Sequence, residues 1–171
     1  MVPSLSASDA NFVPTGGYWC GSVWAPTTYM ILKGLEKQNK LNLAHKIALN
    51  HVENVVKCFC DTNTVWENYS PDEFGKNSSK RGDFVGWTGL VPIAVLFEFV
   101  MGIKSNVPEN KIVWDVNLTC RHGIKNYPFG PDKTIDLICE ERKSEDEKPV
   151  IYKSNNDVEV YINWKGGNFK I

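Results

Sequence analysis

The sequence lacks a charge imbalance, a long uninterrupted apolar run and a typical secretion signal. Its formal net charge is −1, which gives no basic footprint for nucleic acid and no acidic tail. The longest apolar stretch, residues 90–100, is interrupted by Glu98 and is too short for a membrane span. Residues 1–6 have neither a charged start nor an apolar block of signal length. We therefore expect a soluble chain that binds neither nucleic acid nor membranes, and its compartment stays open.

The sequence also lacks a cysteine pattern typical of disulfides or metals. An odd count of five is spread widely, which argues against a disulfide framework. Cys58 and Cys60 do not have the C-x-x-C spacing of zinc and redox sites. We expect free, buried thiols, with no metal and no cofactor.

Tryptophan, by contrast, is abundant. The chain has 171 residues, enough for one domain or a domain and a half, with an ordinary hydrophobic content of 42% and 23% charged residues. Of its six tryptophans, four lie between Trp19 and Trp87. Such clustering favours a stacking site over a simple core.

The stretch 65–89 combines rings, an acid and glycines. Glu67 lies between Trp66 and Tyr69, and Trp87 lies between two glycines. Sugar rings stack on aromatic faces, and their hydroxyls need fixed polar partners, so this composition suits a sugar site. The alternative is that the two tryptophans belong to the core and Glu67 is a solvated surface acid.

Helical periodicity dominates the first part of the chain. Apolar residues at helical spacing predict helices over 24–38 and about 42–58, joined by a short loop into an antiparallel hairpin. A third helix, capped by Thr88 and ended by Gly102, is apolar nearly all round, so we expect burial on more than one side. His45 and His51 are six residues apart and are interpreted as surface histidines rather than ligands.

Strict alternation replaces this period near residue 108. It predicts four short strands in one sheet, with a solvated charged turn over 140–148 and a loop over 70–81; the strands are placed at residues 112–118, 135–139, 149–153 and 158–164. The fold class is therefore α + β, with a helical domain over 1–107 and a small antiparallel β unit over 108–171.

The helices carry more apolar surface than so few partners can bury. The faces at residues 29–35 and 90–100 are expected to be uncovered, and exposed apolar patches usually recruit partners. We therefore expect the chain to be the end of a larger protein, and we expect it to self-associate through these faces.

Three motifs, in this order, carry a family resemblance. They are the run Gly16–Tyr29, the tetrad Trp66–Tyr69 and the block Phe84–Leu90. Together they resemble the C-terminal part of the (α/α)6-barrel glycoside hydrolases, especially the mannosylglycerate hydrolase-like and processing α-glucosidase group, with trehalase more distant. The resemblance covers about residues 3–105. It implies a partial (α/α)6 toroid, followed by a small antiparallel β-sheet or sandwich like the one after the barrel in bacterial members.

The resemblance also implies a mechanism and a site. Two carboxylates flank the glycosidic bond in this family, and a glutamate in a motif like Trp66–Tyr69 is the base that activates water, with inversion. Carried over, Glu67 is the general base. The expected substrate is an α-glucoside or related oligosaccharide, bound by Tyr18, Trp19, Trp24, Trp66, Tyr69 and Trp87.

Two departures from the family pattern bear on function. The family's general acid, usually an aspartate, lies well upstream of the first motif and has no counterpart in this chain. Many relatives have an arginine where this chain has Cys20, and a thiol cannot make that residue's bidentate contacts. The isolated chain is therefore expected to bind sugar but hydrolyse it poorly. The alternatives are a non-catalytic carbohydrate-binding or scaffold module, and a plain structural α + β domain.

Overall fold

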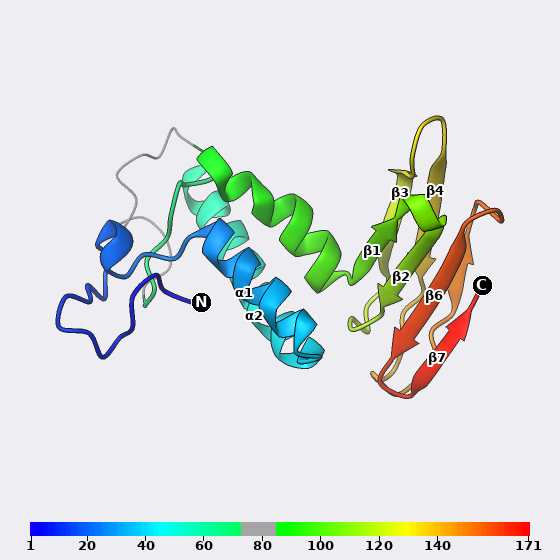
Figure 1. The fold of residues 1–171 in the computed structure, drawn as a ribbon, viewed down its shortest axis with the longest axis horizontal. Coiled ribbons are helices and arrows are strands. Elements are labelled where there is room, and N and C mark those ends of the chain that lie inside the picture. Colours follow the sequence, from blue (N-terminus) through cyan, green and yellow to red (C-terminus); the bar gives the residue numbers. More distant parts are fainter. Residues whose placement is uncertain (73–84) are drawn as a thin grey trace. The chain divides into compact units, whose positions relative to one another are not determined.

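The structure is a computed structural model that describes residues 1–72 and 85–171. Contacts divide the chain into two compact units, Met1–Phe99 and Val100–Ile171. The first is helical and the second consists of strands (Figure 1), which confirms the α + β class. The loop predicted over residues 70–81 lies, from residue 73 on, outside the described residues.

A helical hairpin forms the centre of the first unit (Figure 1). Helix α1 spans Ala25–Lys37, with a proline in its first turn, and α2 spans Leu41–Thr62. Asn39 makes the turn between them in the left-handed region, at φ 56°. Helix α2 is longer than predicted, and it ends where Asn63 also turns left-handed and donates its N–H to the Phe59 carbonyl at 2.7 Å. The two helices joined by a short turn are those that the sequence predicts.

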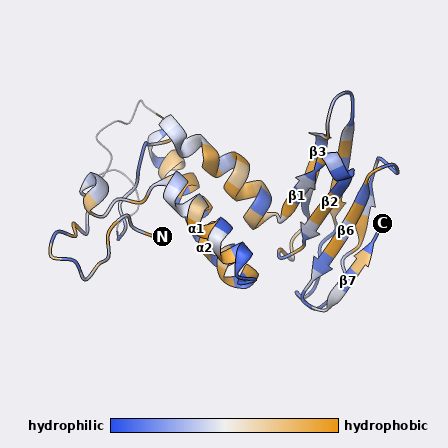
Figure 2. Cartoon of the chain, viewed as in Figure 1, coloured by the Kyte–Doolittle hydropathy of each residue, from blue (hydrophilic) through white to orange (hydrophobic). Residues whose placement is uncertain are grey.

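The third helical segment differs from the predicted α-helix. It consists of a 3-10 turn, Gly86–Leu90, followed by a π-helix, Val91–Val100. Thr88 does not cap it, because its hydroxyl donates to the Glu67 carbonyl at 2.9 Å. Figure 2 shows that the π-helix is mostly hydrophobic, yet Ile93 is 65% exposed. Of its ten residues only Pro92 and Ile93 are exposed, so burial on more than one side stays a prediction.

A hydrophobic cluster joins the hairpin to the segments around it. Its buried members come from α1, α2, the π-helix, the segment before α1 and the segment after α2: Val23, Ala25, Val55, Cys58, Tyr69 and Val91. Apolar side chains remain exposed on the outer surfaces of the helices, among them Met30 and Phe59. Self-association through them stays a prediction. Among the described residues, none of the helices combines the length and apolar character needed to cross a membrane.

His51 corrects the prediction of a surface histidine. Its side chain is fully buried, and both ring nitrogens lack a hydrogen-bond partner within the described part of the chain. Burial lowers its pKa to about 4, so the ring is neutral near pH 7. His45 is only partly buried, and its Nδ1 lies 2.9 Å from the Phe99 carbonyl oxygen.

The second unit contains two sheets rather than one. Within the described residues, the first has the order β1-β2-β6-β7 and the second β3-β4-β5. Their bounds are β1 Ile103–Asn106, β2 Lys111–Asp115, β3 His122–Pro128, β4 Thr134–Cys139, β5 Ile151–Lys153, β6 Glu159–Trp164 and β7 Gly167–Lys170. The predicted strands correspond to β2, β4, β5 and β6. Strands β2 and β6 pair in parallel, which corrects the all-antiparallel expectation.

Alternation explains which strands the sequence revealed. Ile112 and Trp114 of β2 are buried, as are Ile135 and Leu137 of β4, so one face of each strand lies in the core. The missed strands are weaker signals: β1 and β7 have four residues each, and the register of β3 shifts between Ile124 and Tyr127.

Arg142 is the one exception to the solvated charged turn predicted over residues 140–148, whose other residues are all exposed. Its side chain is buried. The guanidinium donates to the carbonyls of Glu145 and Glu147 at 3.1 and 2.8 Å, and to those of Val116 and Leu118 at 3.1 and 2.9 Å. The buried guanidinium therefore ties the turn to the segment 116–118.

Candidate functional site

The first part of the site is a closed loop before α1. The Val13 N–H donates to the Cys20 carbonyl at 2.8 Å, which brings the loop's ends together. Gly17 and Gly21 leave no room for side chains: an added Cβ would lie 2.8 Å from Val13 Cγ2 and 2.7 Å from the Val13 carbonyl oxygen, respectively. The two glycines therefore allow the loop to close.

Ser4 fastens this loop to the N-terminal segment. Its hydroxyl donates to the Trp19 carbonyl at 3.0 Å and accepts the Gly21 N–H at 3.3 Å. Its own N–H donates to the Ser22 carbonyl at 3.0 Å. This role was not predictable from the sequence, because a serine in an aperiodic segment is too common to stand out.

Four rings gather where the loop meets α1; we call them the aromatic cluster, Tyr18, Trp19, Trp24 and Trp87. The Trp19 and Trp24 rings stack, with centroids 4.2 Å apart and planes 8° apart. Tyr18 and Trp87 approach Trp24 edge-on, at 4.8 and 5.9 Å. Stacked and T-shaped pairs of this kind are favourable. The structure thus unites residues from two of the three sequence motifs.

The cluster is open on one side. Trp24 is fully buried, whereas Tyr18, Trp19 and Trp87 are 53%, 46% and 49% exposed. Tyr18 also has a left-handed backbone, with φ 61°, which is strained for a bulky residue and typical of functional sites. The three exposed rings offer apolar surface to a ligand, and each of them packs against the buried Trp24 ring.

An isolated antiparallel bridge joins the first motif to the Trp66–Tyr69 tetrad. Val23 and Tyr69 exchange both backbone hydrogen bonds, at 2.9 and 3.0 Å. The Ser70 hydroxyl, one residue further, donates to the Pro14 carbonyl at 3.3 Å. These links bring the two motifs together although the α1–α2 hairpin separates them in the sequence.

Glu67 lies in the tetrad at the point where the third motif joins. Glu67 as a whole is 7% exposed. Its carbonyl accepts the Thr88 hydroxyl, and Thr88 directly follows Trp87. Among residues 1–72 and 85–171, the Glu67 carboxylate has no hydrogen-bond or ion-pair partner. A largely buried residue thus carries a carboxylate that is available to a ligand.

Trp66 and Tyr69 pack into the core rather than into the aromatic cluster. The Trp66 indole packs against the hydrophobic cluster and donates its Nε1–H to the Thr62 hydroxyl at 2.9 Å. Tyr69 is 1% exposed, and its hydroxyl accepts the Trp66 N–H at 3.1 Å. Burial raises the pKa of Tyr69. These two side chains hold the tetrad in place.

The thiols are free, as expected, but not all are buried. Cys58 and Cys139 are buried, whereas Cys20, Cys60 and Cys120 are exposed. Cys20 follows Trp19 of the aromatic cluster directly. In the described part of the chain, no group of three or more histidine, cysteine, aspartate or glutamate side chains could hold a metal ion.

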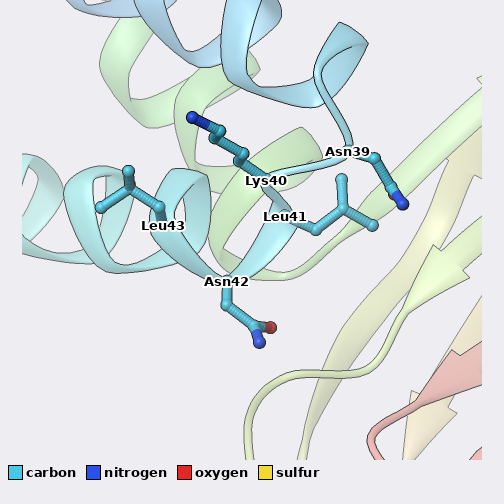
Figure 3. Close-up of a pocket in the computed structure, with 5 residues that line it drawn as sticks. All are labelled: Asn39, Lys40, Leu41, Asn42 and Leu43. Carbon is cyan, nitrogen blue, oxygen red and sulfur yellow. The ribbon is translucent and has the colours of Figure 1, made fainter.

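A separate hollow lies at the turn between α1 and α2. Its volume is about 440 Å³, and it is lined by residues 39–43 (Figure 3). The lining consists of two asparagines, one lysine and two leucines. It offers neither an aromatic ring nor a carboxylate, so it lacks the chemistry that the sequence motifs share.

Comparison with known proteins decides the family. Residues 2–96, more than half of the chain, match the model of the glycosyl hydrolase family 63 C-terminal domain. The chain belongs to this family. The resemblance to glycoside hydrolases is thereby confirmed, and the matched region contains all three motifs.

Three curated relatives illustrate this family relationship. An uncharacterized protein of Borreliella burgdorferi is 24% identical over 153 residues, 82% of this chain and 32% of the relative. A probable mannosyl-oligosaccharide glucosidase of Schizosaccharomyces pombe is 34% identical over 101 residues, 53% of this chain and 12% of that protein. Alpha-glucosidase 2 of Arabidopsis thaliana is 26% identical over 91 residues, 48% of this chain and 11% of that protein.

The family 63 chain thus spans about a third or less of the length of these relatives. No solved structure matches it.

Proposed function

We propose that this chain contributes the base side of an inverting glycosidase site that acts on α-glucosides or related oligosaccharides. Family membership and two relatives named as glucosidases support the reaction class. The aromatic cluster supports a sugar ligand, because flat apolar rings stack on sugar faces. Glu67 is the proposed general base, and the helices are proposed to form part of an (α/α)6 barrel.

The observation that carries the proposal is the state of the Glu67 carboxylate. Buried carboxylates are normally paired or hydrogen-bonded, because desolvation of an isolated charge is unfavourable. Glu67 is only 7% exposed and lacks such partners in the described residues, although its backbone is firmly held by Thr88. A structural acid would be paired and a surface acid would be solvated. An available carboxylate, on a residue that Thr88 joins to the motif of Trp87, fits a base that binds water or substrate.

In the proposed reaction, Glu67 removes a proton from a water molecule as the water oxygen bonds to the anomeric carbon. The bond from that carbon to the leaving oxygen breaks with inversion, and the leaving oxygen takes its proton from a second carboxylic acid. In inverting sites the two carboxyls are about 6.5–9.5 Å apart. None of the residues of this chain is assigned as that acid, so we propose that it is supplied by a segment outside this sequence.

The test uses a substrate that does not need the acid. Fluoride leaves a glycosyl fluoride with little protonation, so α-glucosyl fluoride isolates the contribution of the base. We expect hydrolysis to β-glucose, seen by NMR, and a fall of about 10²-fold or more in turnover for Glu67→Gln, with added azide restoring part of it. Glu53→Gln, an exposed glutamate of α2, is the control. Turnover near wild type in Glu67→Gln would remove Glu67 from this role.

The second candidate is a non-catalytic carbohydrate-binding module. Its supporting observation is that Trp19 and Trp87 each expose about half of their surface, and stacking requires no catalytic acid. This candidate predicts oligosaccharide binding, measured by calorimetry, that Trp19→Ala weakens and Glu67→Gln preserves, with no turnover of the fluoride in either protein. Turnover that depends on Glu67 excludes it.

A further inference from the structure

Asn68, the neighbour of the proposed base, has an unusual environment. Its residue is 1% exposed, and its Oδ1 atom has no hydrogen-bond partner in residues 1–72 and 85–171. More than about 90% of buried polar groups in proteins do have a partner, from protein or from ordered water. An unpartnered buried acceptor in a packed region therefore points to a bound molecule that can donate a hydrogen bond.

The backbone on both sides of Asn68 is fixed. The carbonyl of Glu67, in the peptide that joins it to Asn68, accepts the Thr88 hydroxyl at 2.9 Å. On the other side, Tyr69 is held by the two hydrogen bonds of its bridge to Val23. Asn68 cannot easily rearrange to find another partner. Its unpartnered carbonyl is thus a consequence of how the tetrad is held.

The local bend allows Asn68 and Glu67 to act together. In a regular strand, adjacent side chains point to opposite faces. Residues 67 and 68 both lie in a bend instead, so this alternation does not separate their side chains. Glu67 presents a carboxylate, for which the described residues supply no partner. Asn68 presents a buried amide oxygen that also has none.

We propose that Glu67 and Asn68 hold one water molecule between them, and that this is the water that Glu67 activates; the second clause rests on the proposed function. A water molecule has two hydrogens to donate, and two acceptors occupy both. Its lone pairs are then left facing away from the acceptors, available for the anomeric carbon. Asn68 would thus fix the orientation of the nucleophile, and Glu67 would receive its proton.

A stability measurement separates this role from a merely structural one. Asn68→Leu keeps the approximate shape and removes the unpartnered acceptor, which by itself can be neutral or stabilising. We expect an unchanged or raised Tm, up to about 2–4 °C, together with a fall of at least about 10-fold in kcat on α-glucosyl fluoride and little change in KM. A merely structural role predicts a lowered Tm and an unchanged kcat in the folded protein.

Thr28→Val is the matched control. Thr28 is also fully buried, and its hydroxyl also lacks a partner in the described residues, but it lies on α1 outside the tetrad. We expect Thr28→Val to leave kcat unchanged. Both substitutions replace a buried unpartnered oxygen by a methyl group, and Asn68→Leu also replaces the amide nitrogen by one. A fall in kcat confined to Asn68→Leu therefore reports the position of Asn68 in the tetrad.

A crystal structure supplies a readout that does not depend on activity. We expect an ordered water within about 3.2 Å of both Asn68 Oδ1 and a Glu67 carboxylate oxygen, absent in Asn68→Leu. Absence of this water from the wild-type protein, or an unchanged kcat in Asn68→Leu when Glu67→Gln is inactive, overturns the inference. The water present with full turnover in Glu67→Gln would instead overturn the proposed function and leave the water site in place.

Discussion

The Trp19 ring lies flat on the Trp24 ring, with centroids 4.2 Å apart and planes inclined by only 8°. Trp24 is fully buried and Trp19 is 46% exposed. One face of Trp19 is therefore occupied by protein, and the exposed part of the ring is held in a fixed orientation. Because Trp19 is already ordered, binding a sugar ring on its exposed part would carry a smaller entropic cost.

The two stacked rings should differ strongly in their effect on stability. Trp24→Ala removes a fully buried ring and should lower the free energy of unfolding by about 3–5 kcal/mol. Trp19→Ala loses mainly its ring contacts, about 0.5–1.5 kcal/mol. Urea unfolding followed by far-UV circular dichroism measures both. Equal losses would mean that Trp24 is not the support of the cluster.

The two glycines Gly21 and Gly34 should respond in opposite directions to alanine. Gly21 has φ 145°, and an added Cβ would lie 2.7 Å from the Val13 carbonyl oxygen, so Gly21→Ala should destabilise by about 1–3 kcal/mol. Gly34 lies inside α1, near its C-terminal end, with nothing within 4 Å of such a Cβ. Gly34→Ala should therefore stabilise by up to about 1 kcal/mol. Thermal unfolding of the two variants provides the comparison, and a stabilised Gly21→Ala would contradict the loop geometry.

Buried His51 should make the stability of the helical unit depend on pH. Its pKa is about 4 in the folded chain and 6.5 ordinarily, so between these values the unfolded chain binds more protons. The His51 contribution is fully present above about pH 6.5 and is lost as the pH falls toward 4, by about 3 kcal/mol in total. Urea unfolding from pH 7 to pH 4 should show a shallower decline in His51→Leu than in wild type. Identical slopes would exclude this role.

Arg142 should stabilise its turn far more than a surface arginine does. Arg142→Met leaves four carbonyls without their charged donor, and we expect a loss of about 3 kcal/mol or more. Arg121, whose ion pair with Glu140 is exposed, is the matched control, and Arg121→Met should cost no more than about 1 kcal/mol. Hydrogen exchange of residues 143–150 should accelerate only in Arg142→Met. Similar losses in both variants would contradict the fastening role.

Regular periodicity made most of the elements predictable. Tyr29, Leu32 and Leu35 mark one face of α1, and the strict alternation of Ile112 and Trp114 marks β2, because a buried face imposes its period on the sequence. Strand β3 has a register shift between Ile124 and Tyr127, which breaks that period. Arg142 was missed because two of the carbonyls that it binds, those of Val116 and Leu118, are distant in the sequence. His51 was misplaced because a histidine on a helix equally suits a buried face and an exposed one.

The candidate site was only partly predictable, for a related reason. Motif order identified Trp19, Glu67 and Trp87 as one group of candidates, since a shared chemistry left a pattern along the chain. The direction of the side chains in the tetrad was not readable, because its short, bent backbone has no period that separates a core face from a ligand face. The hydrogen bond from Thr88 to the Glu67 carbonyl was not predictable either, since a threonine before an apolar run equally suits a helix cap.

The bridge between Val23 and Tyr69 has a consequence for the evolution of this chain. Val23 precedes α1 and Tyr69 follows α2, and the two residues pair with each other. The chain therefore leaves and returns to the same place on either side of the α1–α2 hairpin. Turns can be added or removed at its tip, around residues 39–40, with only a small change in loop-closure entropy. Length variation among homologues should therefore accumulate at that tip, where it leaves the spacing between Trp24 and Glu67 in space unaltered.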